Sequence, residues 1–229
     1  MNPIIVALDV ATAEEAMRLA KAVEPYVGGF KVGLRLLLGP GPATVAAVAD
    51  LGKPVFADAK LHDIPSQAAP AARRLGDFGA RWVTAHAAGG GAMLAAVAEA
   101  LSASGGGGGV LAVTVLTSLS AGDLAAAGIG ETPGRLTSRM SRLAAASGCE
   151  GVVCSPRELG VVAEVAPELT TFTPGIRPRD IADDQARVAT PAEALRRGAD
   201  YLVIGRPITS APDPARAAAG LWEEIAGEG

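Results

Sequence analysis

Charged residues of both signs gather in the segment 55–65, which reads Val-Phe-Ala-Asp-Ala-Lys-Leu-His-Asp-Ile-Pro. Alternate side chains of a β-strand share one face, so Asp58 and Lys60 point the same way as Phe56. An isolated charge is too costly to bury, and a carboxylate beside an ammonium is therefore expected to form an ion pair. A third charge, Asp63, follows at once. Two interpretations stay open: an ion pair that only stabilises the fold, or a catalytic site.

Polar residues follow other apolar runs in the same way. Asp9 ends the first run, Lys31 lies on the second, and Thr117 and Ser118 follow the fifth. Each is weak evidence alone, because a lone aspartate after a strand is often a helix cap. In a parallel sheet, however, the carboxyl ends of the strands meet at one edge. We therefore expect one cleft of alternating carboxylates and ammonium groups, which is typical of a functional site.

A second group of residues has the chemistry of an anion site. Pro174 and Arg177 follow the seventh run, Gln185 comes eight residues after Arg177, and Gly205 and Arg206 follow Ile204 in the eighth run. A glycine lets the backbone approach an anion closely, and a guanidinium offers a planar pair of donors for phosphate oxygens. We interpret this group as a phosphate site. A solvent-exposed arginine without a ligand is the alternative for Arg206.

The elements that would position these residues alternate along the chain. Short apolar or β-branched runs, typical of buried parallel strands, cover residues 4–10, 29–34, 54–60, 81–87, 110–116, 151–155, 171–176 and 201–208. Segments typical of helices cover residues 12–23, 41–51, 66–78, 91–102, 133–147, 156–165, 191–197 and 212–226. Eight strand–helix pairs predict an α/β protein with a (β/α)8 TIM-barrel fold, in which catalytic residues lie at the carboxyl ends of strands. An open doubly wound sheet is the competing architecture. No stretch resembles a linker, so we predict a single domain over residues 1–229.

Composition and charge argue against several classes of function. The net charge of −4 and the 3% aromatic content argue against a nucleic-acid partner. No apolar run is long enough to span a membrane and no signal peptide opens the chain, which predicts a cytoplasmic protein. Cys149 and Cys154 lack a second pair that would complete a zinc site. His62 and His86 could ligate a metal with Asp58, but a hydrogen-bonded structural role is the favoured interpretation, and we predict no metal.

Together these segments resemble the orotidine 5′-phosphate decarboxylase family over nearly the whole chain. The matching segments are residues 7–9, 30–33, 58–65, 116–118, 173–177 and 203–208, and the combination is more specific than its Asp58-x-Lys60-x-x-Asp63 core alone. The resemblance implies homodimers of (β/α)8 barrels with active sites at the subunit interface. It also implies conversion of orotidine 5′-monophosphate to uridine 5′-monophosphate, in de novo pyrimidine biosynthesis, without metal or organic cofactor.

The resemblance further implies roles for individual residues. Lys60 would protonate carbon 6 of the pyrimidine, Lys31 and Asp58 would complete the charged network, and Asp63 would come from the partner subunit to the substrate carboxylate. Asp9 and Lys31 would contact the ribose hydroxyls, and Thr117 and Ser118 would contact the pyrimidine. The phosphate would be held by Gln185, Gly205 and Arg206, with Arg177 assisting. Further contacts with the substrate are expected from Ile64, Pro65, Gln67 and Pro174. The chain departs from the family in one place, because the family usually has Ile-Pro-Asn-Thr at 64–67. Gln67 stands where the family threonine reaches across the dimer to the ligand.

The chemistry needs an explanation, because loss of CO2 from an sp2 ring carbon leaves a carbanion without an electron sink. Most decarboxylases borrow that sink from a cofactor, and the chain offers no recognisable cofactor site. Our hypothesis is that Asp63 raises the energy of the bound carboxylate and that the Lys60 ammonium stabilises and protonates the carbanion. The nearest alternative is a metal-dependent sugar-phosphate decarboxylase or synthase of the same barrel group, with a divalent ion near Asp58. A barrel that only binds a phosphorylated ligand or a protein would be expected to lack one of the charged residues, and all are present.

Overall fold

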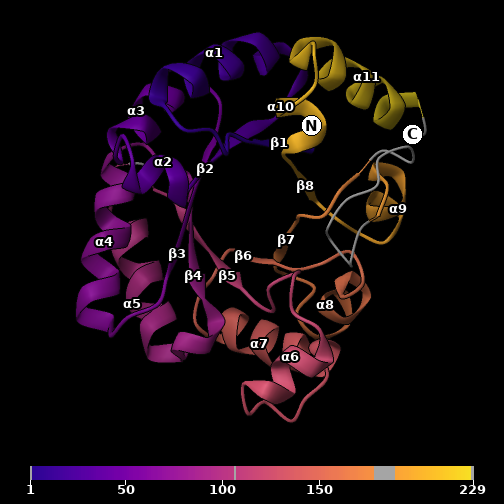
Figure 1. Cartoon of the computed structure of the whole chain (residues 1–229). Coiled ribbons are helices and arrows are strands. Elements are labelled where there is room, and N and C mark those ends of the chain that lie inside the picture. Colours follow the sequence, from indigo (N-terminus) through magenta and orange to yellow (C-terminus); the bar gives the residue numbers. More distant parts are fainter. Residues whose placement is uncertain (1, 106, 178–188, 228–229) are drawn as a thin grey trace.

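Eight parallel strands close into a barrel at the centre of the molecule (Figure 1). The computed structural model describes residues 2–105, 107–177 and 189–227. Within this part each strand pairs with the next, and the eighth returns to pair with the first. The strands are β1 (Ile4–Ala7), β2 (Gly29–Gly33), β3 (Val55–Leu61), β4 (Trp82–His86), β5 (Gly109–Val113), β6 (Gly151–Val153), β7 (Thr170–Thr173) and β8 (Tyr201–Ile204). The predicted (β/α)8 barrel is confirmed, and the open doubly wound sheet is wrong.

The strands bury both of their faces, as parallel strands covered by helices do. On β3, Val55 packs in the layer between barrel and helices, whereas Phe56 points into the barrel. Inside the barrel Phe172 meets Phe56 and Trp82 edge to face, with ring centroids 5.6 and 4.9 Å apart. These aromatic rings fill part of the barrel interior, and Phe56 also forms part of the wall of the cavity described below.

Helices cover the outside of the barrel (Figure 1). Those expected from the sequence are α1 (Ala13–Val23), α3 (Ala43–Ala49), α4 (Pro65–Asp77), α5 (Gly91–Ser102), α7 (Pro133–Ala146), α8 (Leu159–Val165), α9 (Pro191–Arg196) and α11 (Pro214–Gly227). Helix α9 begins with a capping box, in which the Thr190 hydroxyl accepts from the Glu193 N–H and the Glu193 carboxylate accepts from the Thr190 N–H. In the described ranges no helix has the length and apolar character needed to cross a membrane.

Several short elements differ from the sequence-based expectation. Three short helices, α2 (Leu34–Leu38), α6 (Ala121–Ala126) and α10 (Arg206–Thr209), follow strands β2, β5 and β8, and two 3-10 turns, η1 (Glu24–Tyr26) and η2 (Ala87–Gly89), were also not expected. The eighth run was expected to remain a strand through residue 208, and this is wrong. Gly205 has φ −108° and ψ −107°, which is not a strand conformation, and Pro207 has no N–H for a strand ladder. Arg206 therefore starts a helical turn on the barrel rim.

An ion pair ties strands together at the N-terminal end of the barrel. The Arg81 guanidinium, just before β4, donates two hydrogen bonds of 2.7 Å to the carboxylate of Glu150, just before β6. The Trp82 indole N–H donates a third, also 2.7 Å long. A Cβ on Gly109 would overlap this carboxylate, so the first position of β5 has room only for glycine. The contact therefore fixes β4, β5 and β6 at the end of the barrel opposite the cavity.

Candidate active site

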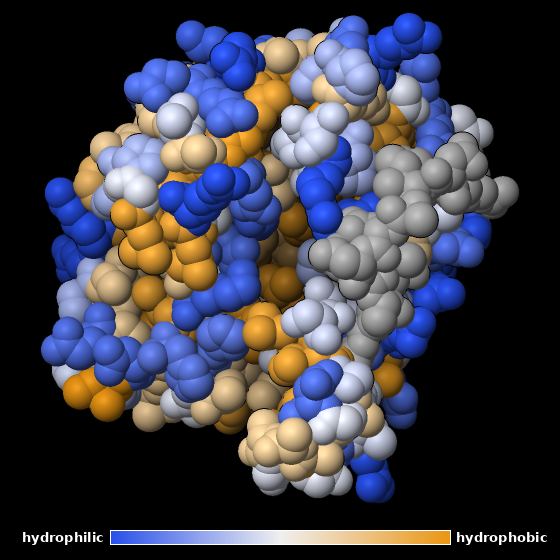
Figure 2. Space-filling view, viewed as in Figure 1, coloured by the Kyte–Doolittle hydropathy of each residue, from blue (hydrophilic) through white to orange (hydrophobic). Residues whose placement is uncertain are grey.

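A cavity of about 640 Å³ opens at the C-terminal ends of the strands. Figure 2 shows a hollow near the centre of this face, with hydrophilic side chains around much of its rim. Residues on, or directly after, β1, β2, β3, β5, β6, β7 and β8 form its wall. One part of the wall is apolar, with Val113, Val153 and Val203, and another part is charged. The cavity therefore offers both a dry surface for a flat ring and fixed charges for polar groups.

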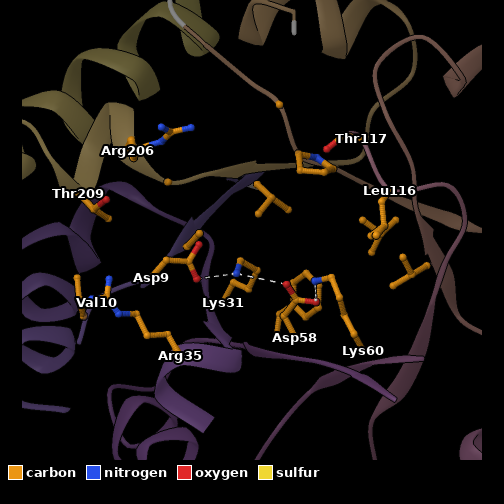
Figure 3. Close-up of a pocket in the computed structure, with 18 of the residues that line it drawn as sticks. Asp9, Val10, Lys31, Arg35, Asp58, Lys60, Leu116, Thr117, Arg206 and Thr209 are labelled. Atoms are coloured by element: carbon orange, nitrogen blue, oxygen red, sulfur yellow. Dashed lines mark hydrogen bonds and ion pairs between the residues drawn. The ribbon is translucent and has the colours of Figure 1, made fainter. Parts of the chain in front are cut away.

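Four charged side chains form a continuous chain of ion pairs along one side of the cavity (Figure 3). The Lys31 ammonium lies 2.9 Å from Asp9 Oδ1 and 3.3 Å from Asp58 Oδ2. The other oxygen of Asp58 accepts a hydrogen bond from Lys60 Nζ at 2.6 Å. The structure thus brings together Asp9, Lys31 and the Asp58–Lys60 pair, in the order acid, base, acid, base.

Burial and pairing act in opposite directions on the two inner members of this chain. Burial alone would lower the pKa of the Lys31 ammonium, but attraction to Asp58 and Asp9 outweighs it and the pKa is raised. Burial alone would raise the pKa of the Asp58 carboxyl, but Lys31 and Lys60, with hydrogen bonds from Lys60 and Thr84, hold that pKa below its ordinary value. Both groups therefore stay charged at neutral pH. The Lys60 side chain is 31% exposed against 11% for Asp58, so Lys60 is the more accessible to a ligand.

Strand β3 is bulged where Asp58 and Lys60 lie. The pairing of β3 with β4 shifts its register between residues 57 and 61, so residues 58–60 lie opposite a single residue of β4, Thr84. Lys60 has φ +48°, a left-handed conformation that is rare for a residue with a Cβ. The alternation of side chains between the two faces of β3 therefore ends at Asp58. Beyond it, the bulge and not the alternation sets the direction in which the Lys60 side chain points.

Gly33, at the end of β2, leaves the space that the Asp9–Lys31 pair occupies. A Cβ at this position would lie 2.7 Å from Asp9 Oδ1 and 3.0 Å from Lys31 Nζ. Both distances are shorter than ordinary contacts of a Cβ, so a larger residue would push the pair apart. The sequence places this glycine two residues after Lys31, but only the structure shows why a side chain is excluded there.

The residues predicted to bind phosphate lie elsewhere on the same cavity. Pro174, Arg177, Gly205 and Arg206 all line it, and Figure 3 shows Arg206 across the cavity from Lys60. Arg177 is buried, and its guanidinium donates to the carbonyl of Ile176 at 2.8 Å. Gln185 lies outside the described residues. Arg206 therefore lies at a distance from the Asp58–Lys60 pair, which suits a ligand with an anionic group at one end.

Five predicted contact residues do not line the cavity of their own chain. Four of them lie before or within the first turn of α4 and one follows β5: Asp63, Ile64, Pro65, Gln67 and Ser118. The Asp63 carboxylate is exposed and accepts a hydrogen bond from the N–H of Ile64 at 2.7 Å. Thr117, by contrast, lines the cavity. A single chain therefore assembles the network of four charges without Asp63.

The cavity wall also includes side chains that the sequence patterns do not reveal. Glu15 of α1, Arg35 of α2, and Thr209 and Ser210 at the end of α10 line it. In Figure 3, Arg35 and Thr209 lie near Asp9, away from Lys60. Prediction from strand ends misses them because helices, rather than strands, bring them to the cavity.

The two histidines lie against each other beside the bulge. The ring centroids of His62 and His86 are 5.4 Å apart. Burial is the main cause that lowers the pKa of His86, and the nearby His62 and Lys60 lower it further. The His86 ring is therefore neutral at neutral pH. In the part of the chain that the structure describes, no three His, Cys, Asp or Glu side chains gather as metal ligands. The alternative metal site of His62, His86 and Asp58 is therefore not formed in this part.

Comparison with known proteins gives one family. The family model described as "Orotidine 5'-phosphate decarboxylase / HUMPS family" matches residues 2–221. Proteins named orotidine 5′-phosphate decarboxylase from Anaeromyxobacter sp. (strain K) and Thermobifida fusca are 51% and 49% identical to this chain. The alignments cover 94% of both chains for the first protein, and 97% of this chain and 95% of the relative for the second. The crystal structure of orotidine 5′-phosphate decarboxylase from Lactobacillus acidophilus superposes with a TM-score of 0.86 at 31% identity, covering 98% of this chain and 99% of that one. The chain belongs to the orotidine 5′-phosphate decarboxylase / HUMPS family.

Proposed function

We propose that this chain decarboxylates orotidine 5′-monophosphate to uridine 5′-monophosphate, a step of de novo pyrimidine biosynthesis, without metal or organic cofactor. The observation that carries the proposal is the chain of alternating charges from Asp9 to Lys60, in a cavity whose other side presents Gly205 and Arg206. Relatives whose sequences are 51% and 49% identical to this chain are named for this activity. We propose further that residues 1–229 form one catalytic domain built on the single barrel.

Lys60 is the proton donor in this proposal. The bond between carbon 6 and the carboxylate breaks, CO2 leaves, and the electron pair of that bond stays on carbon 6. A proton then passes from Lys60 Nζ to carbon 6, and the neutral amine takes a proton from solvent before the next turnover. The ammonium also stabilises the developing carbanion before it transfers the proton, which lowers the barrier more than it stabilises the bound substrate.

Asp58 and Lys31 hold the proton donor in place. Asp58 Oδ1 binds Lys60 Nζ at 2.6 Å, and its other oxygen is 3.3 Å from Lys31 Nζ. The two charges on either side keep Asp58 ionised, since they lower its pKa against the effect of burial. The ionised Asp58 therefore gives the Lys60 ammonium a charged hydrogen-bond partner that holds it at one place in the cavity. In this proposal Asp9 and Lys31 bind the ribose hydroxyls.

The far side of the cavity anchors the phosphate. Gln185, Gly205 and Arg206 bind phosphate oxygens, with Arg177 assisting. Thr117 lies against the pyrimidine, and Pro174 is a further contact of the nucleotide. An anchor remote from the reacting carbon supplies binding energy that orients the ring over Lys60.

We also propose a homodimer in which Asp63, Ile64, Pro65 and Gln67 complete the site of the partner subunit. Asp63 then lies beside the substrate carboxylate, and Gln67 takes the place of a threonine that is usual in the family. Two observations support this: Asp63 does not line the cavity of its own chain, and apolar side chains are exposed on the segments that follow β2 and β3. Leu38 is 82% and Ile64 61% exposed, and Figure 2 shows an apolar area over α2 beside the hollow.

The two free cysteine thiols favour a reducing, cytoplasmic location.

The activity is tested by mixing the purified protein with orotidine 5′-monophosphate and following the ultraviolet absorbance. We expect conversion to uridine 5′-monophosphate that continues after treatment with a chelator. No conversion of the nucleotide would contradict the proposed reaction, and a loss of conversion that only a divalent ion restores would favour the metal-dependent alternative.

The shared site is tested by mixing two inactive variants, Lys60→Ala and Asp63→Asn. In a mixed dimer one site carries both substitutions and the other carries neither. Random exchange makes half of the dimers mixed, so the activity should recover to about one quarter of the wild-type value. A mixture as inactive as its components, although the subunits have exchanged, would show that each chain supplies its own Asp63.

A further inference from the structure

Thr84 of β4 lies opposite the bulge of β3 and is fully buried. It does not line the cavity, so it is not placed to touch a ligand there. Its hydroxyl oxygen accepts a hydrogen bond from the main-chain N–H of Lys60 at 2.9 Å and donates one to Asp58 Oδ1 at 3.0 Å. One hydroxyl therefore holds the backbone of one member of the ion pair and the carboxylate of the other.

The first of these bonds stabilises an unfavourable backbone conformation. In a regular ladder an N–H of one strand donates to a carbonyl of its neighbour, but at this bulge the N–H of Lys60 donates to the Thr84 hydroxyl instead. Lys60 has φ +48°, and a left-handed residue with a Cβ persists only where its surroundings hold it. Without the hydroxyl, the N–H of Lys60 would lose its acceptor and the bulge would relax toward ordinary strand geometry.

The second bond fixes the orientation of the carboxylate. Asp58 Oδ1 accepts from both Lys60 Nζ and Thr84 Oγ1, and these two donors, with Lys31 at the other oxygen, set the rotation of the carboxylate. The hydroxyl is committed as an acceptor to the Lys60 N–H, which leaves its own proton for Asp58. A hydrophobic side chain of the same shape could make neither bond.

We infer that Thr84 is a positioning residue for the decarboxylation, which aims the Lys60 ammonium by holding both the left-handed backbone of Lys60 and the carboxylate of Asp58. This inference rests on the proposed function of Lys60. Because Thr84 acts through Lys60 and is not placed to contact the nucleotide, its loss should lower kcat and leave KM nearly unchanged. An error of about 1 Å in the position of a reacting group can cost about 100-fold in rate.

The test compares Thr84→Val, which keeps the shape and loses the hydroxyl, with Thr84→Ser, which keeps the hydroxyl. We expect kcat of the valine variant to fall by about 10- to 100-fold, with KM for orotidine 5′-monophosphate within about threefold of wild type. The serine variant should keep most of the wild-type kcat. Equal kcat values for the folded valine variant and the wild type would overturn the inference, and so would a serine variant as slow as the valine variant.

Thr171→Val is a matched control for a purely structural loss. Thr171 of β7 is buried. Its hydroxyl oxygen accepts a hydrogen bond from the backbone N–H of Asp200 at 2.9 Å, and the hydroxyl donates one to the Asp200 carboxylate, also at 2.9 Å. This network joins the start of β7 to the start of β8, at the end of the barrel away from the cavity. We expect Thr171→Val to lower the thermal stability as Thr84→Val does, but to keep the wild-type kcat.

A crystal structure of Thr84→Val distinguishes failure of this inference from failure of the proposed reaction. The inference predicts that Lys60 leaves the left-handed region or that its Nζ moves away from Asp58 Oδ1. An unchanged Lys60 in that structure would overturn the inference even if the wild-type protein had no decarboxylase activity.

Discussion

Gly33 tests whether the space around the ion pairs is set as closely as the structure indicates. In Gly33→Ala the new Cβ would lie 2.7 Å from Asp9 Oδ1, whereas ordinary contacts of a Cβ begin at 3.4 Å, so the oxygen must retreat by about 0.7 Å. Asp9 will move before Lys31, because its side chain is 55% exposed and that of Lys31 only 10%. A retreat of this size breaks the 2.9 Å hydrogen bond between them.

The consequences of Gly33→Ala follow from what Asp9 does. The pair is partly exposed, so we expect the free energy of unfolding to fall by only about 1 kcal/mol in urea titrations. Loss of a charge-assisted contact to the ribose should raise KM about tenfold, with a smaller effect on kcat. Initial rates followed by ultraviolet absorbance measure both constants. Gly160→Ala is the control, because a Cβ at this position of α8 has open space. A Gly33→Ala protein with wild-type KM and stability would show that the Asp9–Lys31 pair does not need the space left by Gly33.

Three further predictions concern charge. The pKa of Asp58 is lowered on folding and that of Lys31 is raised, so the stability they contribute is lost as the pH falls through the folded pKa of Asp58 or rises through that of Lys31. Urea titrations should therefore show a contribution that is constant from about pH 5 to 9 and decreases on either side, and Asp58→Asn should reduce the loss of stability on the acidic side. Arg206→Ala should raise KM by about 10- to 100-fold for the nucleotide and leave the weak binding of the phosphate-free nucleoside unchanged; equal effects on both ligands would contradict a phosphate contact. Glu150→Gln weakens the bidentate contact with Arg81 far from the cavity, and because both side chains are about one third exposed it should lower the free energy of unfolding by about 1 kcal/mol in thermal unfolding. An altered kcat in Glu150→Gln would show that this end of the barrel is coupled to the site.

The barrel was predictable because its strands carry a strong and repeated signal. Parallel strands buried on both faces appear as short apolar runs, and the eight runs match the eight strands described. The ends of the strands were less predictable, as the eighth run shows. Ile204 and Ile208 are both apolar and buried, but one ends a strand and the other belongs to a helical turn. Apolar character alone does not distinguish the two, and Gly205 and Pro207 decide the outcome.

The charged centre was predictable in composition and less so in geometry. The positions of Asp9, Lys31 and Asp58 follow from strand ends and alternation, which are local properties of the sequence. The direction of Lys60 depends on a bulge, and the bulge depends on a partner in another strand, Thr84, 24 positions along the chain. A threonine inside an apolar run gives no local sign of such a role. Rim residues such as Arg35 escape prediction for the same reason, because the placement of whole helices brings them to the cavity.

The role of Lys60 as proton donor is tested by the turnover of orotidine 5′-monophosphate by Lys60→Ala. We expect kcat to fall by at least about 10⁴-fold while the nucleotide still binds, because the variant loses both the proton donor and the charge that stabilises the carbanion. Lys53→Ala, which removes a lysine paired with Glu24 and hydrogen-bonded to the carbonyl of Val27, should keep wild-type turnover. A folded Lys60→Ala protein whose kcat is within about tenfold of the wild-type value would contradict the role of Lys60 as proton donor.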